Sequence, residues 1–224
     1  MVDHTLKVFE NDLEGLDQRI ADLGRCAVDE LDGALKALVH SDCAAARAVI
    51  ESDAHADALT RQIQHEVLRI TARWQPVASD LRKILASERI GANLERAADH
   101  AKNIAKRSLA LDEPISEQQA VMLERLAAIA RRQLKQVLEA WATKDVKLAQ
   151  VVWLSDTEAD GLHDDLFHHI LADIREGRGP TINGVHLLFI AKSLERIGDH
   201  ATNIAEEVRF MVAGITVSEP RPHA

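Results

Sequence analysis

A twelve-residue segment of this chain occurs twice, and this repeat limits the fold more than any other feature. Residues 94–105 read LERAADHAKNIA and residues 194–205 read LERIGDHATNIA, so nine of twelve positions are identical. Further upstream, an offset of 103 aligns residues 52–53 with residues 155–156. Self-similarity of this kind is typical of folds built from copies of one supersecondary unit. We therefore expect two copies of one unit, related by a pseudo-twofold axis.

Each copy is predicted to contain three helices. Apolar residues recur at steps of three and four along most of the chain, which places one apolar stripe along each helix. Aromatic residues make up only 3% of the chain and tyrosine is absent, so the residues that favour sheets are scarce. Residues that end or cap helices separate the segments. These breaks are Ser41-Asp42, Trp74-Gln75-Pro76, Asp112-Glu113-Pro114 with Ser116 as a candidate cap, Thr143-Lys144-Asp145, and Gly177-Arg178-Gly179-Pro180.

The predicted fold class is therefore all-α, with two tandem three-helix bundles and six long helices. The first unit is expected to span residues 1–111 and the second residues 112–214, followed by a loose tail over residues 215–224. Because the connections between helices are short, helices that follow one another in the sequence should run antiparallel. The apolar run at residues 187–191 is far shorter than the roughly 20 residues of a membrane span. The N-terminus does not resemble a signal peptide, so a soluble protein is expected.

Charge and motif content exclude several functions. The formal net charge is −9, which disfavours nucleic-acid binding because neutralising phosphates requires clustered Lys and Arg. The chain contains none of the motifs G-x-x-x-x-G-K-S/T, G-x-G-x-x-G and H-E-x-x-H. We therefore predict that the protein is not an enzyme.

The repeat also preserves rows of carboxylates. Glu95, Asp99 and Asn103 are four residues apart, and each step turns about 40° around a helix, so they form one polar stripe. Acidic side chains at this spacing repel one another unless a cation lies between them, and carboxylate oxygens suit hard cations such as Mg²⁺, Mn²⁺ or iron. The candidate metal ligands are Asp53, Asp57, Glu95 and Asp99 in the first unit, and Asp156, Asp160, Glu195, Asp199 and Asn203 in the second.

The same rows have a second interpretation, which the spacing leaves open. They could be solvated acidic faces on which Arg96 and Arg196 act as partners. The two histidines that follow the aspartates, His100 and His200, point away from the glutamates and are expected to pack or form hydrogen bonds and not to bind metal.

The repeated residues resemble the hallmark of the PhoU family, E-R-x-x-D-H-x-x-N-I-A-E, which occurs once in each bundle. The second copy carries it in full from Glu195 to Glu206, whereas the first runs from Glu95 to Ala105 and ends in the basic pair Lys106-Arg107. The D-x-x-x-D elements on the earlier helices also match. The resemblance covers roughly residues 5 to 213.

This resemblance implies a cytoplasmic, non-enzymatic negative regulator of the phosphate-starvation response. Such proteins couple a phosphate ABC transporter, through its PstB-like ATPase, to a PhoR-like sensor histidine kinase, and so lie at the membrane only through their partners. Some members bind a divalent metal or an iron or zinc cluster through these carboxylates, and many are homodimers. The basic Lys106-Arg107 leaves open whether the first unit binds metal as the second would.

Two other functions are compatible with a helical bundle that carries carboxylates. A carboxylate-bridged di-iron bundle, either an oxidase or an iron store, would use Glu-x-x-His motifs on two helices. The nearest matches, Asp160-x-x-His163 and Asp165-x-x-His168, are aspartate versions that do not recur in the other half. The other alternative is a helical adaptor with neither metal nor a role in phosphate signalling.

Overall fold

In the computed structural model, residues 2–215 are described, without the side chains of residues 2–6 and 156–157. Every regular element within this range is an α-helix, which confirms the predicted fold class. The six predicted helices are present, but the fifth is interrupted at Ser155. The elements are α1 (Val2–His40), α2 (Cys43–Trp74), α3 (Ala78–Ser108), α4 (Glu117–Thr143), α5 (Val146–Leu154), α6 (Asp156–Glu176) and α7 (Thr181–Ala213).

The helices begin and end where the capping residues predict. Asp42 and Asp145 are equivalent in the two copies, and each accepts hydrogen bonds from two backbone N–H groups of the helix that follows. Ser116 and Gln119 form a reciprocal capping box at the start of α4. The predicted tail, residues 215–224, lies outside the described residues except for Ile215.

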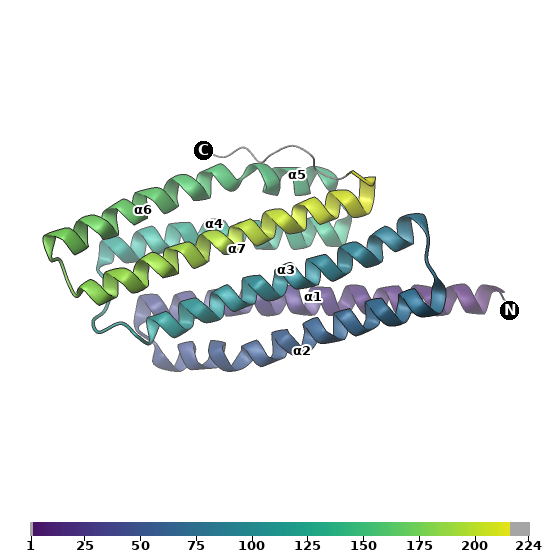
Figure 1. Ribbon diagram of the computed structural model, residues 1–224, viewed down its shortest axis with the longest axis horizontal. Helices are drawn as coiled ribbons and strands as arrows, with labels where there is room; N and C mark the ends of the chain where they lie inside the picture. The colour runs from purple at the N-terminus through teal and green to yellow at the C-terminus, as the bar shows by residue number, and fades with distance from the viewer. Residues whose placement is uncertain (1, 216–224) are drawn as a thin grey trace.

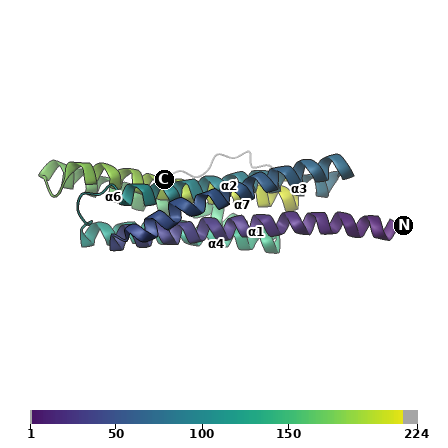
Figure 2. The same cartoon turned by 90° about the horizontal axis from the view of Figure 1, so that it is seen from below.

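The helices lie in two layers (Figures 1 and 2). α3 and α7 lie side by side at the centre of one layer, with α2 on one flank and α5 and α6 on the other. α1 and α4 form the second layer. α1, α2 and α3 pack on one another, as do α4, α7 and the α5–α6 pair, and the two sets meet through α3–α7 and α1–α4. This arrangement places an equivalent surface of α3 and of α7 next to its flanking helix.

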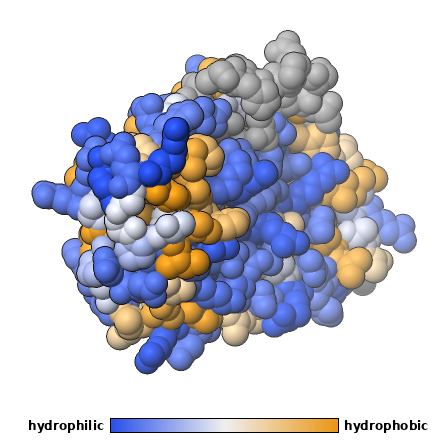
Figure 3. Space-filling model, turned by 60° about the vertical axis from the view of Figure 1, so that its left-hand side comes forward, coloured by the Kyte–Doolittle hydropathy of each residue, from blue (hydrophilic) through white to orange (hydrophobic). Residues whose placement is uncertain are grey.

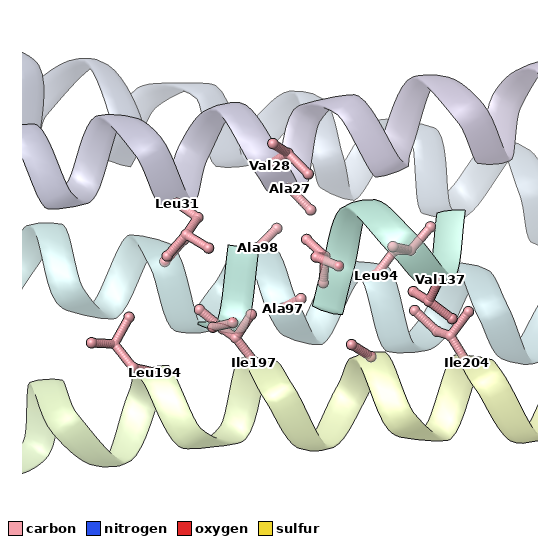
Figure 4. Close-up of a cluster of buried hydrophobic side chains, with 14 of the residues drawn as sticks. Ala27, Val28, Leu31, Leu94, Ala97, Ala98, Val137, Leu194, Ile197 and Ile204 are labelled. Carbon is pink, nitrogen blue, oxygen red and sulfur yellow. The ribbon is translucent and has the colours of Figure 1, made fainter. Parts of the chain in front are cut away.

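The hydrophobic core is continuous across both sets of helices. Figure 4 shows Ala27 and Leu31 of α1, Ala97 of α3, Val137 of α4 and Ile197 of α7 meeting in one cluster. All five are almost completely buried. Because one core joins the two sets, the division into units at residues 111 and 112 remains a prediction.

The surface is mostly hydrophilic, with several separate hydrophobic patches on the face in Figure 3. Large apolar side chains that are exposed include Phe189 and Val185 of α7 and Leu109 after α3. None of the described helices is both long enough and apolar enough to cross a membrane.

Candidate functional site

The first set of predicted carboxylates comes together between α2 and α3. We call Asp53, Asp57, Glu95 and Asp99 the first acidic ladder. Asp53 of α2 and Asp99 of α3 both contact the same lysine, and the charge of Asp57 on α2 reaches Glu95 on α3. Asp57 itself is the most exposed of the four and lies 3.9 Å from Arg61 of its own helix. Asn103, the third residue of the stripe, is exposed to solvent.

A lysine that the sequence analysis did not single out sits inside this ladder. The Nζ atom of Lys102 lies 2.8 Å from a carboxylate oxygen of Asp53 on α2 and 2.5 Å from one of Asp99 on α3. Its side chain is only 17% exposed. Lys102 therefore joins two helices and shares one positive charge between two carboxylates. These two contacts raise the pKa of Lys102 against the opposing effect of burial, so the ammonium keeps its proton.

The neighbouring carboxyl groups respond differently to this lysine. Burial opposes the ionisation of Asp99, but the hydrogen bond and charge of Lys102 outweigh it, so the pKa of Asp99 lies below its usual value. Burial, followed by the negative charge of Asp99, raises the pKa of Glu95. Arg96 lies 3.5 Å from Glu95 and 3.6 Å from Asp99 and adds an exposed positive charge at the edge. At the centre of the first ladder the Lys102 ammonium therefore pairs with the Asp99 carboxylate, and Glu95, whose pKa is raised, lies beside them.

The second acidic ladder consists of Asp156, Asp160, Glu195, Asp199 and Asn203, on α6 and α7. Glu195 pairs with Lys192 and Asp199 with Arg196, at 3.3 Å for the latter, and both cations belong to α7 itself. Lys192 is 46% exposed and Glu195 17%, so it is the cation of this pair that lies near solvent. Asp160 is half-buried, and Asp156 falls outside the residues whose side chains the structure describes.

The position of Lys102 is taken by Thr202 in the second copy, because the two motifs are offset by 100 residues. Thr202 is completely buried, and its hydroxyl donates to the backbone carbonyl of Asp199 at 2.8 Å. A threonine carries no charge and cannot reach across to α6 as a lysine can. The second ladder therefore lacks the cation that the first has at this position.

Beneath each ladder lies a buried polar side chain that the sequence analysis missed. Glu30 of α1 accepts hydrogen bonds from Ser52 at 2.8 Å and from Cys26 at 3.4 Å, and burial raises its pKa. At the equivalent place, with an offset of 103, Gln133 of α4 donates to the hydroxyl of Ser155 at 3.0 Å. One oxygen of Glu30 and the side-chain oxygen of Gln133 are buried without a hydrogen-bond partner.

The two histidines meet where α3 and α7 pack together. The rings of His100 and His200 stack with centroids 5.6 Å apart and an interplanar angle of 29°. Asn93 of α3 lies 3.0 Å from Nδ1 of His200. Burial, reinforced by the charge of Arg196, lowers the pKa of His100. This packing agrees with the role predicted for the histidines.

The basic pair that ends the first motif does not lie at the first ladder. Lys106 is exposed, and Arg107 lies 3.4 Å from His186 and 4.1 Å from the ring centroid of Phe189, both on α7. Its counterpart Glu207 pairs instead with Arg89 of α3, at 3.3 Å. These residues therefore belong to the α3–α7 interface, and the sequence difference that changes the first ladder is the one at position 102.

The residues suggested for a di-iron site do not converge. His163 lies beside Asp164 and Phe167 of its own helix. Asp165 and His168 are exposed on α6. Among the side chains that the structure describes, no three His, Cys, Asp or Glu residues are close enough to hold one metal ion. The di-iron alternative therefore has no observation in its favour.

Comparison with known proteins gives a consistent result. The family model for the PhoU domain matches residues 20–108 and again residues 123–208. The phosphate-specific transport system accessory protein PhoU homolog of Zymomonas mobilis is 40% identical over 97% of this chain and 92% of its own length. The protein of the same name from Rhizobium meliloti is 40% identical over 98% of this chain and 93% of its length. The crystal structure of PhoU from Pseudomonas aeruginosa superimposes with a TM-score of 0.89 at 31% identity, covering 92% of this chain and all of that one.

Proposed function

This chain belongs to the PhoU family, and from that premise we propose that it is the accessory protein of a phosphate-specific transport system. The observation that carries the proposal is the full-length match to relatives with that name, in which both copies of the motif fall within the matched domains. The likeness to a solved PhoU structure supports the same conclusion.

In this proposal the protein is a negative regulator that acts through protein contacts and not as an enzyme. It couples the PstB-like ATPase of the transporter to a PhoR-like sensor histidine kinase, so that the kinase stays inhibitory when phosphate is plentiful. It works in the cytoplasm, as a homodimer, and reaches the membrane through these partners. The exposed apolar side chains, such as Phe189 and Val185, are surfaces of the kind that protein partners cover.

We also propose that a divalent metal ion binds the second acidic ladder and draws its carboxylates together, because those that the structure describes are not close enough to share an ion as they stand. The residues that would hold it are Asp156, Asp160, Glu195, Asp199 and Asn203. Their carboxylate and amide oxygens suit a hard cation. The buried side-chain oxygen of Gln133 on α4, which has no hydrogen-bond partner, lies against Gly198 of α7, the helix that carries Glu195 and Asp199. Such an ion would offset part of the negative charge of the carboxylates. The negative charge that this face presents to a partner would then be lower with the ion bound than without it.

Deleting the gene in its own host tests the regulatory proposal. The measurement is the activity of a phosphate-responsive promoter in cells grown with abundant phosphate. The deletion should raise this activity, and a plasmid copy of the wild-type chain should return it to the repressed level. Unchanged activity in the deletion strain would contradict the proposal.

Direct binding tests the partners. The purified full-length chain is titrated by calorimetry against the cytoplasmic region of the kinase and against the transporter ATPase, with bovine serum albumin as a negative control. Saturable binding to both is expected, and no heat with either would contradict the coupling.

A further inference from the structure

The metal site that the family resemblance implies can be tested against the residues of each ladder, and the first ladder does not fit it. We propose that Lys102 is the permanent counter-cation of the first acidic ladder, and that it takes the place in which a metal ion would lie. The first unit would then bind no divalent metal. This inference holds whether or not the second ladder binds one.

The position of the ammonium carries the inference. It contacts one oxygen of Asp53 at 2.8 Å and one of Asp99 at 2.5 Å, and so lies between the helices that would share an ion. A divalent cation needs carboxylate oxygens at about 2.0–2.6 Å, and Ca²⁺ or Mg²⁺ needs six or more ligands. Two of the oxygens that such an ion would need, one from each helix, are already in contact with the lysine. Metal and ammonium would also repel each other at this separation.

Burial explains why Lys102 would not simply move away. Its side chain is 17% exposed and that of Asp53 is 15% exposed, so solvent screens the pair poorly. If a metal ion displaced the ammonium, Lys102 would lose its ion pairs with both Asp53 and Asp99. By contrast, the exposed Lys192 of the second ladder can turn into solvent at little cost.

The layer beneath the ladders gives an independent indication. Glu30 stands below the first ladder, where the positive charge of Lys102 reaches it. The equivalent pair in the second unit is Gln133 with Thr202, in which both charges are missing. The buried acid and the buried base are therefore present together in one unit and absent together in the other. The positive charge of Lys102 thus acts on Glu30 as well as on the two aspartates that it contacts.

The test measures Mn²⁺ binding by the full-length chain in a Glu195→Gln/Asp199→Asn background, which removes carboxylates of the second ladder. Titration calorimetry and elemental analysis after dialysis report the number of ions bound. The background protein should bind no Mn²⁺. Adding Lys102→Thr, which reproduces the second copy, should create one Mn²⁺ site, and a further Asp99→Asn should remove it.

Thermal unfolding supplies a second readout. Lys102→Thr should lower the unfolding temperature, and Mn²⁺ should restore it, because the ion replaces the lost positive charge. Lys102→Gln, which keeps most of the side-chain length, provides a second variant in case the threonine variant does not fold. Lys192→Thr in the same background removes an exposed lysine and should gain no Mn²⁺ site.

Two results would overturn the inference. One is Mn²⁺ uptake by the background protein that disappears with Asp53→Asn/Asp99→Asn, because the first ladder would then bind metal beside Lys102. The other is the absence of any new Mn²⁺ site in folded Lys102→Thr and Lys102→Gln proteins, because Lys102 would then not be what keeps metal out.

Discussion

Lys102 and Thr202 occupy equivalent positions in two copies of one motif, yet they give the two acidic ladders different properties. In the first unit a buried lysine bridges α2 and α3. In the second unit the ion pairs of Glu195 and Asp199 are made with exposed cations of α7. Identity at nine of twelve positions therefore conserves the helix and its acidic stripe but not the source of the balancing charge.

The buried residues beneath the ladders, Glu30 and Gln133, also differ between the two units, and this difference accounts for a difference in the helices. Gln133 donates to the backbone carbonyl of Ser155 at 3.3 Å, and the helix is interrupted there between α5 and α6. A side chain that competes for a backbone carbonyl is a known cause of helix breaks. In the first unit Glu30 accepts from the hydroxyl of Ser52, and α2 continues through this position.

The largest expected effects test whether the cores of the two units are equivalent although the ladders differ. Leu94→Ala and Leu194→Ala each remove a completely buried side chain and should cost about 3 kcal/mol of unfolding free energy. Because one core joins the units, each variant should unfold in a single transition in urea, followed by circular dichroism. Two separate transitions would show that residues 1–111 and 112–214 unfold independently.

The next effect separates the two lysines. Lys102→Met leaves Asp53 and Asp99 without their shared cation and should cost about 2 kcal/mol. Lys192→Met removes an exposed cation that pairs within its own helix and should cost less than about 0.5 kcal/mol. Urea unfolding at neutral pH measures both. Equal costs would remove the distinction between the ladders.

Glu30 and Gln133 predict that the two units differ in how their stability depends on pH. The pKa of Glu30 is raised by burial, so the folded protein holds this proton more tightly than the unfolded chain. Its ionisation therefore lowers stability as the pH rises from the ordinary glutamate pKa of about 4.3 through the folded value. Glu30→Gln does not titrate, and its stability relative to wild type should increase over that interval.

The matched variant in the second unit is Gln133→Glu. It should lose stability with rising pH more steeply than wild type does, because Thr202 supplies no positive charge there. Unfolding free energies at a series of pH values test both variants. Curves parallel to that of wild type would contradict the assignment.

The smallest effects concern the interface between α3 and α7. Arg89 pairs with Glu207, and their counterparts at an offset of 100, Phe189 and Arg107, form a cation–ring contact instead. Arg89→Ala should cost less than about 1 kcal/mol because the arginine is exposed. Arg107→Ala should cost about 0.5–1 kcal/mol through the lost ring contact. High salt should reduce the first cost more than the second, because Arg89 lies 5.8 Å from the ring centroid of Phe210 whereas Arg107 lies 4.1 Å from that of Phe189. Chemical unfolding with and without added NaCl measures both.

Much of the fold could be predicted because it depends on local signals. Apolar spacing defines the helices, and Asp42, Ser116 and Asp145 mark their starts through hydrogen bonds made within a few residues. The break at Ser155 could not be predicted in this way. It depends on a contact with Gln133, which is distant in sequence, and no glycine or proline marks it.

The candidate site was predicted only in part. The repeat identified the carboxylates, but Lys102 was passed over because it lies at one of the three motif positions where the copies differ. A comparison of those positions would have found the substitution by Thr202. Glu30 and Gln133 carry no motif, and their importance appears only when α1 and α4 are packed beneath the ladders.

The central claim is that a buried lysine between helices holds the first ladder, and that Thr202 leaves the second without a cation at the equivalent position. A pair of double-mutant cycles tests it most directly, using Lys102→Met with Asp53→Asn and Lys192→Met with Glu195→Gln, measured by urea unfolding. The account predicts a coupling energy above about 1 kcal/mol for Lys102 with Asp53 and one near zero for Lys192 with Glu195. Equal coupling energies in the two cycles would contradict it.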